Sequence, residues 1–292
     1  MKKSLAHLPK QKREELKLVV ETVLEECPTA QMIILFGSYA RGDWVEDRYT
    51  EDNVTYEYAS DFDILVIVRS GKIVNSTDMW RKIEKRVRHF PIRTWTNLIA
   101  ESVETVNNAL ARGHYFFNDI VKEGVLLYDS GESKRARRRE LHPNERKAVA
   151  KAHFEQWFTS AKDFHLGYEF YLEKRKLKLA AFQLHQATER FFGAILLVFT
   201  NYRPKLHDLE KLRHMVAAHD PALLTVFPQA TAEQKERFDL LNRAYVEARY
   251  NPRYRITRKQ LEYLAGRVEK LQRLTRKICK ARIESYAAPQ PQ

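Results

Sequence analysis

Two aspartates at the start of an apolar run have a spacing that is typical of a metal-binding carboxylate pair. Asp61 and Asp63 lie two residues apart in SDFDILVIV (Ser60 to Val68). Because side chains alternate faces along a strand, both carboxylates project to one side. Neighbouring carboxylates repel each other unless a cation lies between them. The pair predicts a site for Mg²⁺ or Mn²⁺, completed by substrate phosphates; two solvated acids at a strand end are the alternative.

A glycine and a small hydroxyl form the second candidate element. Gly37 and Ser38 stand in LFGSYARGD (Leu35 to Asp43), directly after a β-branched run. A glycine that lets the backbone approach closely, followed by a hydroxyl at a helix start, can bind a phosphate. Arg41 could neutralise a phosphate charge, or it could be a solvated helix residue.

Short strands alternating with helices position these residues. The first half has strand-like runs and helical patterns, which predicts an α/β or α+β domain with a small sheet. The predicted strands cover 32–36, 62–68, 92–100 and 124–128. After residue 145 only helical patterns remain, joined by short loops, which predicts an antiparallel bundle. Its helices are expected over 146–173, 177–200, 207–218, 232–250 and 257–285.

The domain boundaries follow from this change of pattern. We expect a catalytic domain over 1–130, a basic linker over 131–145, a helical bundle over 146–286 and a disordered tail over 287–292. The longest apolar run, Phe191 to Phe199, is much shorter than the roughly 20 residues of a membrane span. With no secretion signal at the N-terminus either, we expect a cytoplasmic protein. The only cysteines, Cys27 and Cys279, exclude a disulfide framework.

Charge is divided unevenly between the two halves. Residues 1–130 hold 18 Lys and Arg against 20 Asp and Glu, whereas residues 131–292 hold 33 against 18. The halves therefore differ by 17 charges, at −2 and +15. A basic half favours an anionic partner, and the run KRARRRE (Lys134 to Glu140) could contact RNA phosphates. Lysines and arginines that cover helix faces in solvent are the alternative.

The first half resembles the nucleotidyltransferase superfamily of DNA polymerase beta, kanamycin nucleotidyltransferase and the minimal nucleotidyltransferases. GSYARGD followed by SDFDILV resembles the family signature over residues 15–130. The resemblance implies that Gly37, Ser38 and Arg41 contact triphosphate and that Asp61 and Asp63 hold magnesium. The spacer is longer than usual, so residues 44–59 are an expected insertion. The family's third carboxylate, which activates the acceptor, is missing from IRTWTNLIA (Ile92 to Ala100). Glu101 is the nearest substitute as a catalytic residue, and an ordinary acid at a helix start is the alternative.

The second half resembles the HEPN domain, the helical module named for higher eukaryotes and prokaryotes nucleotide-binding. The resemblance rests on AAFQLHQATERFFGAIL (Ala180 to Leu196), KLHDLEKL (Lys205 to Leu212) and YVEARY (Tyr245 to Tyr250). It implies a bundle that often dimerises, and thus a homodimer. Many HEPN ribonucleases carry an Arg followed by a His after four to six residues, but no such His follows Arg249. His185, Glu189 and Arg249 could line a polar pocket or form an internal network.

The sequence therefore predicts an α+β nucleotidyltransferase domain followed by an all-α bundle. The expected reaction is magnesium-dependent transfer of a nucleoside monophosphate, AMP from ATP first of all, to a protein or RNA acceptor. The resemblance implies a toxin–antitoxin or defence setting, with the bundle recognising the acceptor or nucleotide. The alternative is an RNA-binding or ribonuclease bundle whose first domain only senses nucleotides or regulates.

Overall fold

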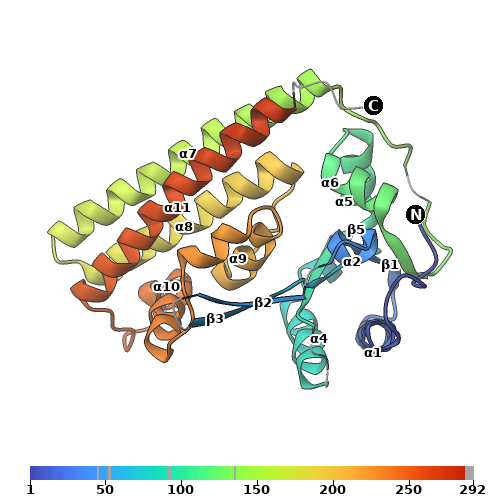
Figure 1. Cartoon of the computed structure of the whole chain (residues 1–292), viewed down its shortest axis with the longest axis horizontal. Coiled ribbons are helices and arrows are strands. Elements are labelled where there is room, and N and C mark those ends of the chain that lie inside the picture. Colours follow the sequence, from blue (N-terminus) through green and yellow to red (C-terminus); the bar gives the residue numbers. More distant parts are fainter. Residues whose placement is uncertain (45, 52–53, 91, 93, 135, 287–292) are drawn as a thin grey trace. The chain divides into compact units, whose positions relative to one another are not determined.

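The chain folds into two compact units, one spanning Met1–Leu141 and the other beginning at His142. The computed structural model describes residues 1–44, 46–51, 54–90, 92, 94–134 and 136–286. The first unit mixes strands and helices, and the second is helical throughout its described part (Figure 1). The predicted α+β class is confirmed.

The first unit is built around a small mixed sheet. Its strands lie in the order β5-β4-β1-β6, where β4 and β5 are parallel and the other pairs antiparallel. A separate antiparallel pair, β2 and β3, lies in the predicted insertion at 44–59. The strands are β1 (Ala30–Phe36), β2 (Glu46–Glu51), β3 (Val54–Ala59), β4 (Phe62–Val68), β5 (Thr96–Ser102) and β6 (Val125–Asp129). The helices are α1 (Lys10–Glu26), α2 (Gly37–Arg41), α3 (Gly71–Val74), α4 (Thr77–His89), α5 (Val103–Ala111) and α6 (Tyr115–Glu123).

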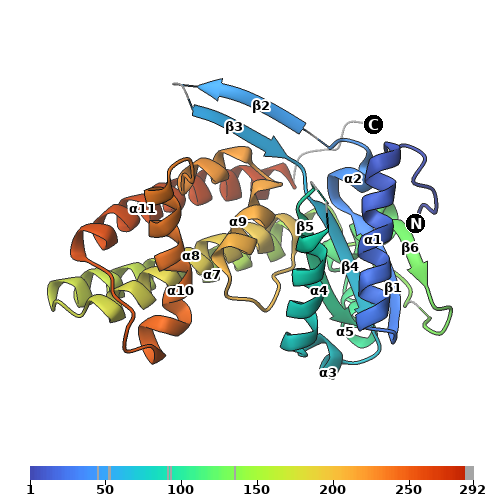
Figure 2. The same cartoon turned by 90° about the horizontal axis from the view of Figure 1, so that it is seen from below.

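Helices cover both faces of the sheet, which explains why its central strands are apolar almost throughout. On one face, Phe62 and Ile64 of β4 join a core with Leu16 and Val19 of α1 and Ile83 of α4. Figure 2 shows α1 and α4 along this face of the sheet. On the other face, Phe36 of β1 meets Phe116 of α6 edge to face, with ring centroids 5.5 Å apart. Asp63 pairs with Phe36 and projects toward this second face.

The β5 strand differs from its predicted extent. The sequence predicted a strand over 92–100, whereas β5 covers Thr96–Ser102 because each of its residues pairs with one of β4, from Phe62↔Thr96 to Val68↔Ser102. The partner strand sets the length of β5, which periodicity alone does not reveal. Glu101 consequently lies within the strand instead of after it.

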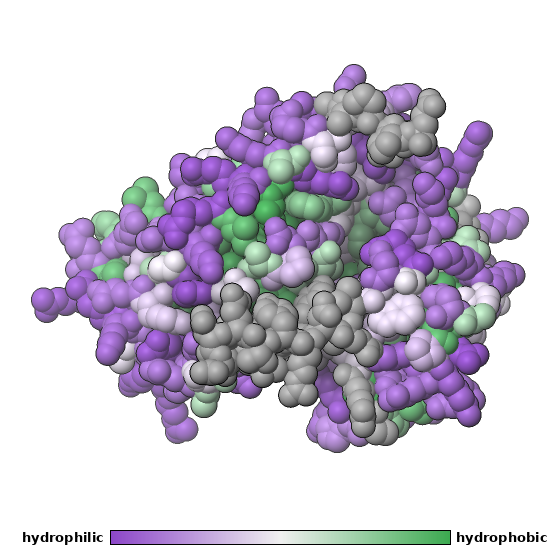
Figure 3. Space-filling model, in the orientation of Figure 1, coloured by the Kyte–Doolittle hydropathy of each residue, from purple (hydrophilic) through white to green (hydrophobic). Residues whose placement is uncertain are grey.

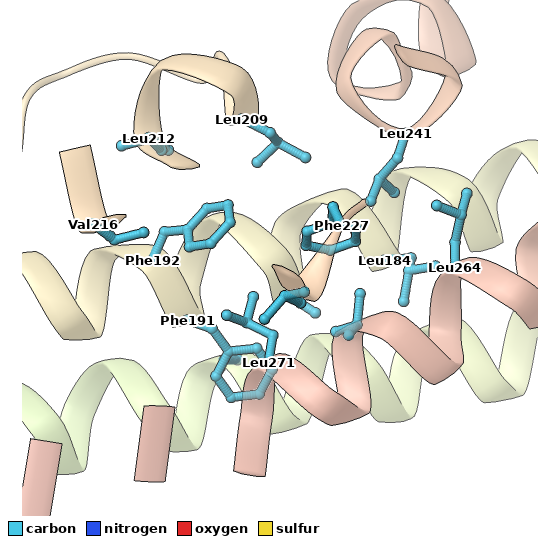
Figure 4. Close-up of a cluster of buried hydrophobic side chains, with 14 of the residues drawn as sticks. Leu184, Phe191, Phe192, Leu209, Leu212, Val216, Phe227, Leu241, Leu264 and Leu271 are labelled. Carbon is cyan, nitrogen blue, oxygen red and sulfur yellow. The ribbon is translucent and has the colours of Figure 1, made fainter. Parts of the chain in front are cut away.

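The second unit packs its helices around α8. These are α7 (Pro143–Glu173), α8 (Leu177–Thr200), α9 (Leu209–Ala217), α10 (Ala232–Tyr250) and α11 (Arg258–Ser285), with a 3₁₀ helix, η1, at Pro221–Val226. Figure 4 shows side chains from α8, α9, α10 and α11 converging, among them Phe191, Leu212 and Leu271, all fully buried. α7 begins earlier than predicted, because Pro143 suits a first helical position and the side chain of Glu145 accepts a hydrogen bond from the His142 backbone.

The described helices include none long and apolar enough to cross a membrane. The face drawn in Figure 3 is largely hydrophilic, in keeping with a composition that is 30% charged. Cys27 and Cys279 are buried free thiols. The tail predicted at 287–292 lies outside the described residues.

Candidate functional site

Strand ends bring Gly37 and the two aspartates to one edge of the four-stranded sheet. Gly37 follows Phe36, which pairs with Asp63 across β1 and β4. Asp61 directly precedes β4 and by strand alternation projects to the same face as Asp63. Gly37 has a φ of 75°, and a Cβ on it would collide with Oδ2 of Asp63. Both the backbone conformation and the space beside Asp63 therefore require glycine.

The neighbouring strand contributes an amide to this edge. Asn97 pairs with Asp63 in the parallel register of β4 and β5. The buried Asn97 side chain donates a hydrogen bond from Nδ2 to Oδ1 of Asp63 over 3.1 Å. This bond orients the carboxyl group, but a neutral amide cannot accept a proton.

The environment of Asp63 opposes its negative charge. Burial raises the pKa of the Asp63 carboxyl to about 7, and the charge of Asp61 acts in the same direction. The hydrogen bond from Asn97 and the charge of Arg41 lower the pKa. Ionising both carboxylates is therefore costly near neutral pH, and a bound cation would offset that cost.

Ser38 and Arg41 belong to the short helix α2, which begins at Gly37. Ser38 is partly buried in α2, and its carbonyl oxygen accepts a hydrogen bond of 2.8 Å from Gly42. Arg41 is half exposed, and its Nε donates to Oδ2 of Asp43 over 3.0 Å. The guanidinium charge is thus shared between Asp43 and, at longer range, the carboxyl of Asp63.

The structure does not bring Glu101 to the aspartates. Glu101 pairs with Ile67, four residues along the strands from the Asp63–Asn97 pair. At roughly 3.3 Å per residue, this is about 13 Å along the strand. Glu101 is therefore not placed to act on a group that Asp61 and Asp63 hold.

The side chains at this edge suit a divalent cation that is bound partly by the protein and partly by substrate phosphates. Among the described residues, no group of three or more His, Cys, Asp or Glu side chains could hold a metal ion. Magnesium, however, is commonly bound by one or two carboxylates together with substrate phosphates. Two carboxylates at one strand end, beside the backbone of Gly37, fit that mode.

A second polar cluster surrounds Glu189 on α8, whose side chain is buried. Its Oε1 accepts a hydrogen bond of 2.5 Å from Arg203, and its Oε2 accepts from Nδ1 of His207 over 2.9 Å. Gln186 donates to the same oxygen over 3.2 Å. Arg203 balances the buried charge, so the carboxylate is fully satisfied.

His185 has an internal role in this cluster. Burial lowers the pKa of His185 to about 4, although the charge of Glu189 opposes the shift. Its Nε2 lies 3.0 Å from the carbonyl oxygen of His207 and therefore carries the proton. Its Nδ1 accepts from Gln186 over 3.3 Å. Both ring nitrogens of this neutral imidazole are occupied, so it is held as a structural group.

Arg249 joins the cluster through the ring of Tyr245. Its guanidinium carbon lies 4.4 Å from the ring centroid of Tyr245 and 4.8 Å from that of Phe182. The His207 ring stacks on Tyr245, with centroids 3.8 Å apart. The Tyr245 hydroxyl is 2.9 Å from Nε2 of His207, but stacking makes it approach from above the imidazole plane, where a hydrogen bond is weak. The in-plane lone pair of Nε2 therefore does not point at the Tyr245 hydroxyl. The His207 side chain is 45% exposed.

Sequence reasoning found His185, Glu189 and Arg249 but not their partners. His207 and Tyr245 lie within the segments KLHDLEKL and YVEARY, yet helical periodicity cannot tell which side chains from different helices meet. Arg203 lies in the loop after α8, outside any motif. Only the fold places it against Glu189.

The helical unit has a recognisable family. Residues 154–278 match the family model of the HEPN domain. These residues are a HEPN domain. The match confirms the resemblance of the second half, and it includes every residue of the Glu189 cluster. None of the curated proteins compared with the chain matches it.

Proposed function

We propose that the chain is a nucleotidyltransferase that depends on a divalent cation and moves a nucleoside monophosphate, AMP from ATP first of all, to a protein or RNA acceptor. The observation that carries this proposal is the convergence of Gly37, Asp61 and Asp63 at one sheet edge. Residues 154–278 match the HEPN domain, a module named for nucleotide binding, and this match supports a function related to nucleotides or RNA.

In this proposal each residue has a distinct task. Asp61 and Asp63 hold Mg²⁺ or Mn²⁺, which when bound neutralises phosphate charge and polarises the α-phosphorus. The backbone of Gly37 and the side chains of Ser38 and Arg41 contact the phosphates. An acceptor oxygen attacks the α-phosphorus as the bond to the β-phosphate oxygen breaks, and pyrophosphate leaves with that electron pair.

Asn97 acts as a positioning residue in this scheme. It keeps the Asp63 carboxyl oriented through the 3.1 Å hydrogen bond. Because an amide is not a base, the proton of a hydroxyl acceptor passes to water or to one of the paired carboxylates.

The HEPN domain would recognise the acceptor. The half that contains it carries the positive charge of the chain, +15 over residues 131–292, which attracts an RNA or an acidic protein surface. We also expect a homodimer formed through this domain, because HEPN domains commonly dimerise. A toxin–antitoxin or defence setting fits the same proposal.

A labelling experiment tests the proposal. The full chain is incubated with each α-labelled nucleoside triphosphate, magnesium and a cell lysate, and labelled protein and RNA are separated. We expect label on one acceptor class with the wild-type chain and none with an Asp61→Asn, Asp63→Asn double variant. Asp78→Asn, which changes a fully exposed acid on α4, is the matched control. Equal labelling by the wild type and the double variant would reject the site.

A second candidate function is action on RNA by the HEPN domain itself, with the first unit regulatory. The favouring observation is His207, held through Nδ1 by Glu189 and partly exposed beside the ring that Arg249 contacts. Such an imidazole can serve as a general base. RNA cleavage lost in His207→Ala and Arg249→Ala but kept in Arg253→Ala, an exposed control, would support this function. We expect no cleavage.

A further inference from the structure

An exposed aromatic residue lies at the edge that carries Asp61 and Asp63. Trp95 directly precedes β5, and its carbonyl oxygen accepts a hydrogen bond of 2.8 Å from the backbone of Phe62, the residue between the two aspartates. Adjacent strands are about 4.8 Å apart. The backbone of Trp95 is therefore one strand away from the proposed cation site.

The indole of Trp95 is unusually exposed for its size. The residue is 38% exposed, and it is the only exposed large hydrophobic residue among those of the first unit that the structure describes. The other two tryptophans of this unit are used internally. Trp44 stacks on Tyr39 with centroids 5.4 Å apart, and Trp80 donates from Nε1 to the Ile73 carbonyl over 2.9 Å.

A cation from another element contacts the ring. Arg88, near the end of α4, places its guanidinium carbon 5.1 Å from the ring centroid of Trp95. A cation over an aromatic face is attractive and restricts the ring's orientation. The result is an ordered, partly exposed indole with a positive charge beside it, at the same strand ends as the carboxylate pair.

We propose that Trp95 is the platform on which the nucleobase of the bound triphosphate stacks. The proposal rests on the proposed function, since the cation site fixes the phosphates while the base extends away from them. Every nucleobase offers a flat aromatic face, so stacking gives affinity for any base. The larger purine rings overlap an indole more fully, so ATP and GTP should bind more tightly than CTP and UTP.

Binding measurements separate the base from the phosphates. Titration calorimetry with magnesium compares ATP with inorganic tripolyphosphate, which has no base, for the wild type, Trp95→Ala and Trp95→Phe. Trp80→Phe is the control. We expect Trp95→Ala to weaken ATP binding about 5- to 150-fold and to leave tripolyphosphate binding unchanged. Trp95→Phe, which keeps an aromatic face, should retain most of the ATP affinity.

The outcomes distinguish the stacking role from the cation site. Unchanged ATP affinity in Trp95→Ala, or an equal loss for ATP and tripolyphosphate, would overturn the stacking role while leaving the cation site intact. If neither ligand binds the wild-type chain with magnesium, the proposed function is wrong and the stacking role is wrong with it. A Trp95→Phe variant as weak as Trp95→Ala would also contradict stacking.

Discussion

Replacing Asn97 with aspartate tests whether its side chain really faces Asp63. The substitution keeps the shape of the side chain but exchanges a hydrogen bond of 3.1 Å for two carboxylates in contact. A hydrogen bond to a charged group contributes about 1.5–3 kcal/mol. Repulsion between like charges about 4 Å apart is of the order of 4 kcal/mol at an effective dielectric constant of 20. Uptake of a proton limits the total, so we expect a loss of about 3 kcal/mol in the free energy of unfolding at pH 8.5.

The pH and cation dependence of this loss follow from the same geometry. Burial already raises the pKa of Asp63 to about 7, and a carboxylate at position 97 raises it further. A pKa raised in the folded state means that stability falls as pH increases toward that value. The Asn97→Asp loss should therefore shrink at pH 5.5, and saturating Mg²⁺ at pH 8.5 should restore most of it, because a shared cation removes the repulsion.

Urea unfolding followed by tryptophan fluorescence provides the assay. A Trp157→Phe background leaves Trp44, Trp80 and Trp95 as the fluorophores, all within the first unit. Asn108→Asp, the same chemical change at an exposed position of α5, is the control. If Asn97→Asp and Asn108→Asp unfold at the same urea concentration at pH 8.5 without divalent cations, the reasoning about this contact is refuted.

Three further predictions concern the two units separately. Gly37→Ala should destabilise the first unit by about 2–3 kcal/mol in the same urea assay, because the residue has a φ of 75° and its Cβ would meet Asp63; an unchanged midpoint would contradict the close approach. Burial lowers the pKa of His185 to about 4 from an ordinary 6.5. The free energy of unfolding of the HEPN domain should therefore fall by about 3 kcal/mol as pH falls from 6.5 to 4, because only the unfolded chain takes up the proton in that range. Unfolding followed by Trp157 fluorescence at pH 7 and pH 4.5 should show a smaller drop in His185→Gln, and equal drops would be contrary to this. The Glu101→Gln variant should transfer nucleotide at the wild-type rate in the labelling assay. A hundredfold lower rate would show that Glu101 takes part in the reaction and would contradict its position on β5.

Sequence patterns predicted the elements of the fold well because each depends on local chemistry. The apolar runs at β1 and β4 and the helical periodicity of the HEPN domain gave element positions to within a few residues. Spacing also placed Asp61 and Asp63 on one face, since strand alternation is a property of the backbone alone. The family match confirms the helical half, and the nucleotidyltransferase interpretation of the first half stays a prediction.

Contacts between distant segments could not be predicted in the same way. The position of Glu101 depends on the pairing of β5 with β4, and sequence periodicity does not fix the register of a parallel pair. For the same reason, the sequence does not predict that Asn97 lies beside Asp63. In the HEPN domain, Arg203 and His207 reach Glu189 from the loop between α8 and α9. Because a loop has no periodic pattern, its contacts cannot be predicted from periodicity.

Manganese binding tests the central claim most directly, because Mn²⁺ can occupy a magnesium site and its free form gives a strong paramagnetic resonance signal. The wild-type chain and the Asp61→Asn, Asp63→Asn variant are each titrated with Mn²⁺ in the presence of a non-hydrolysable ATP analogue, with matched analogue-only samples. We expect the free Mn²⁺ signal to fall below that of the analogue alone with the wild type and not with the double variant. An equal fall with both proteins would show that these aspartates do not hold the cation.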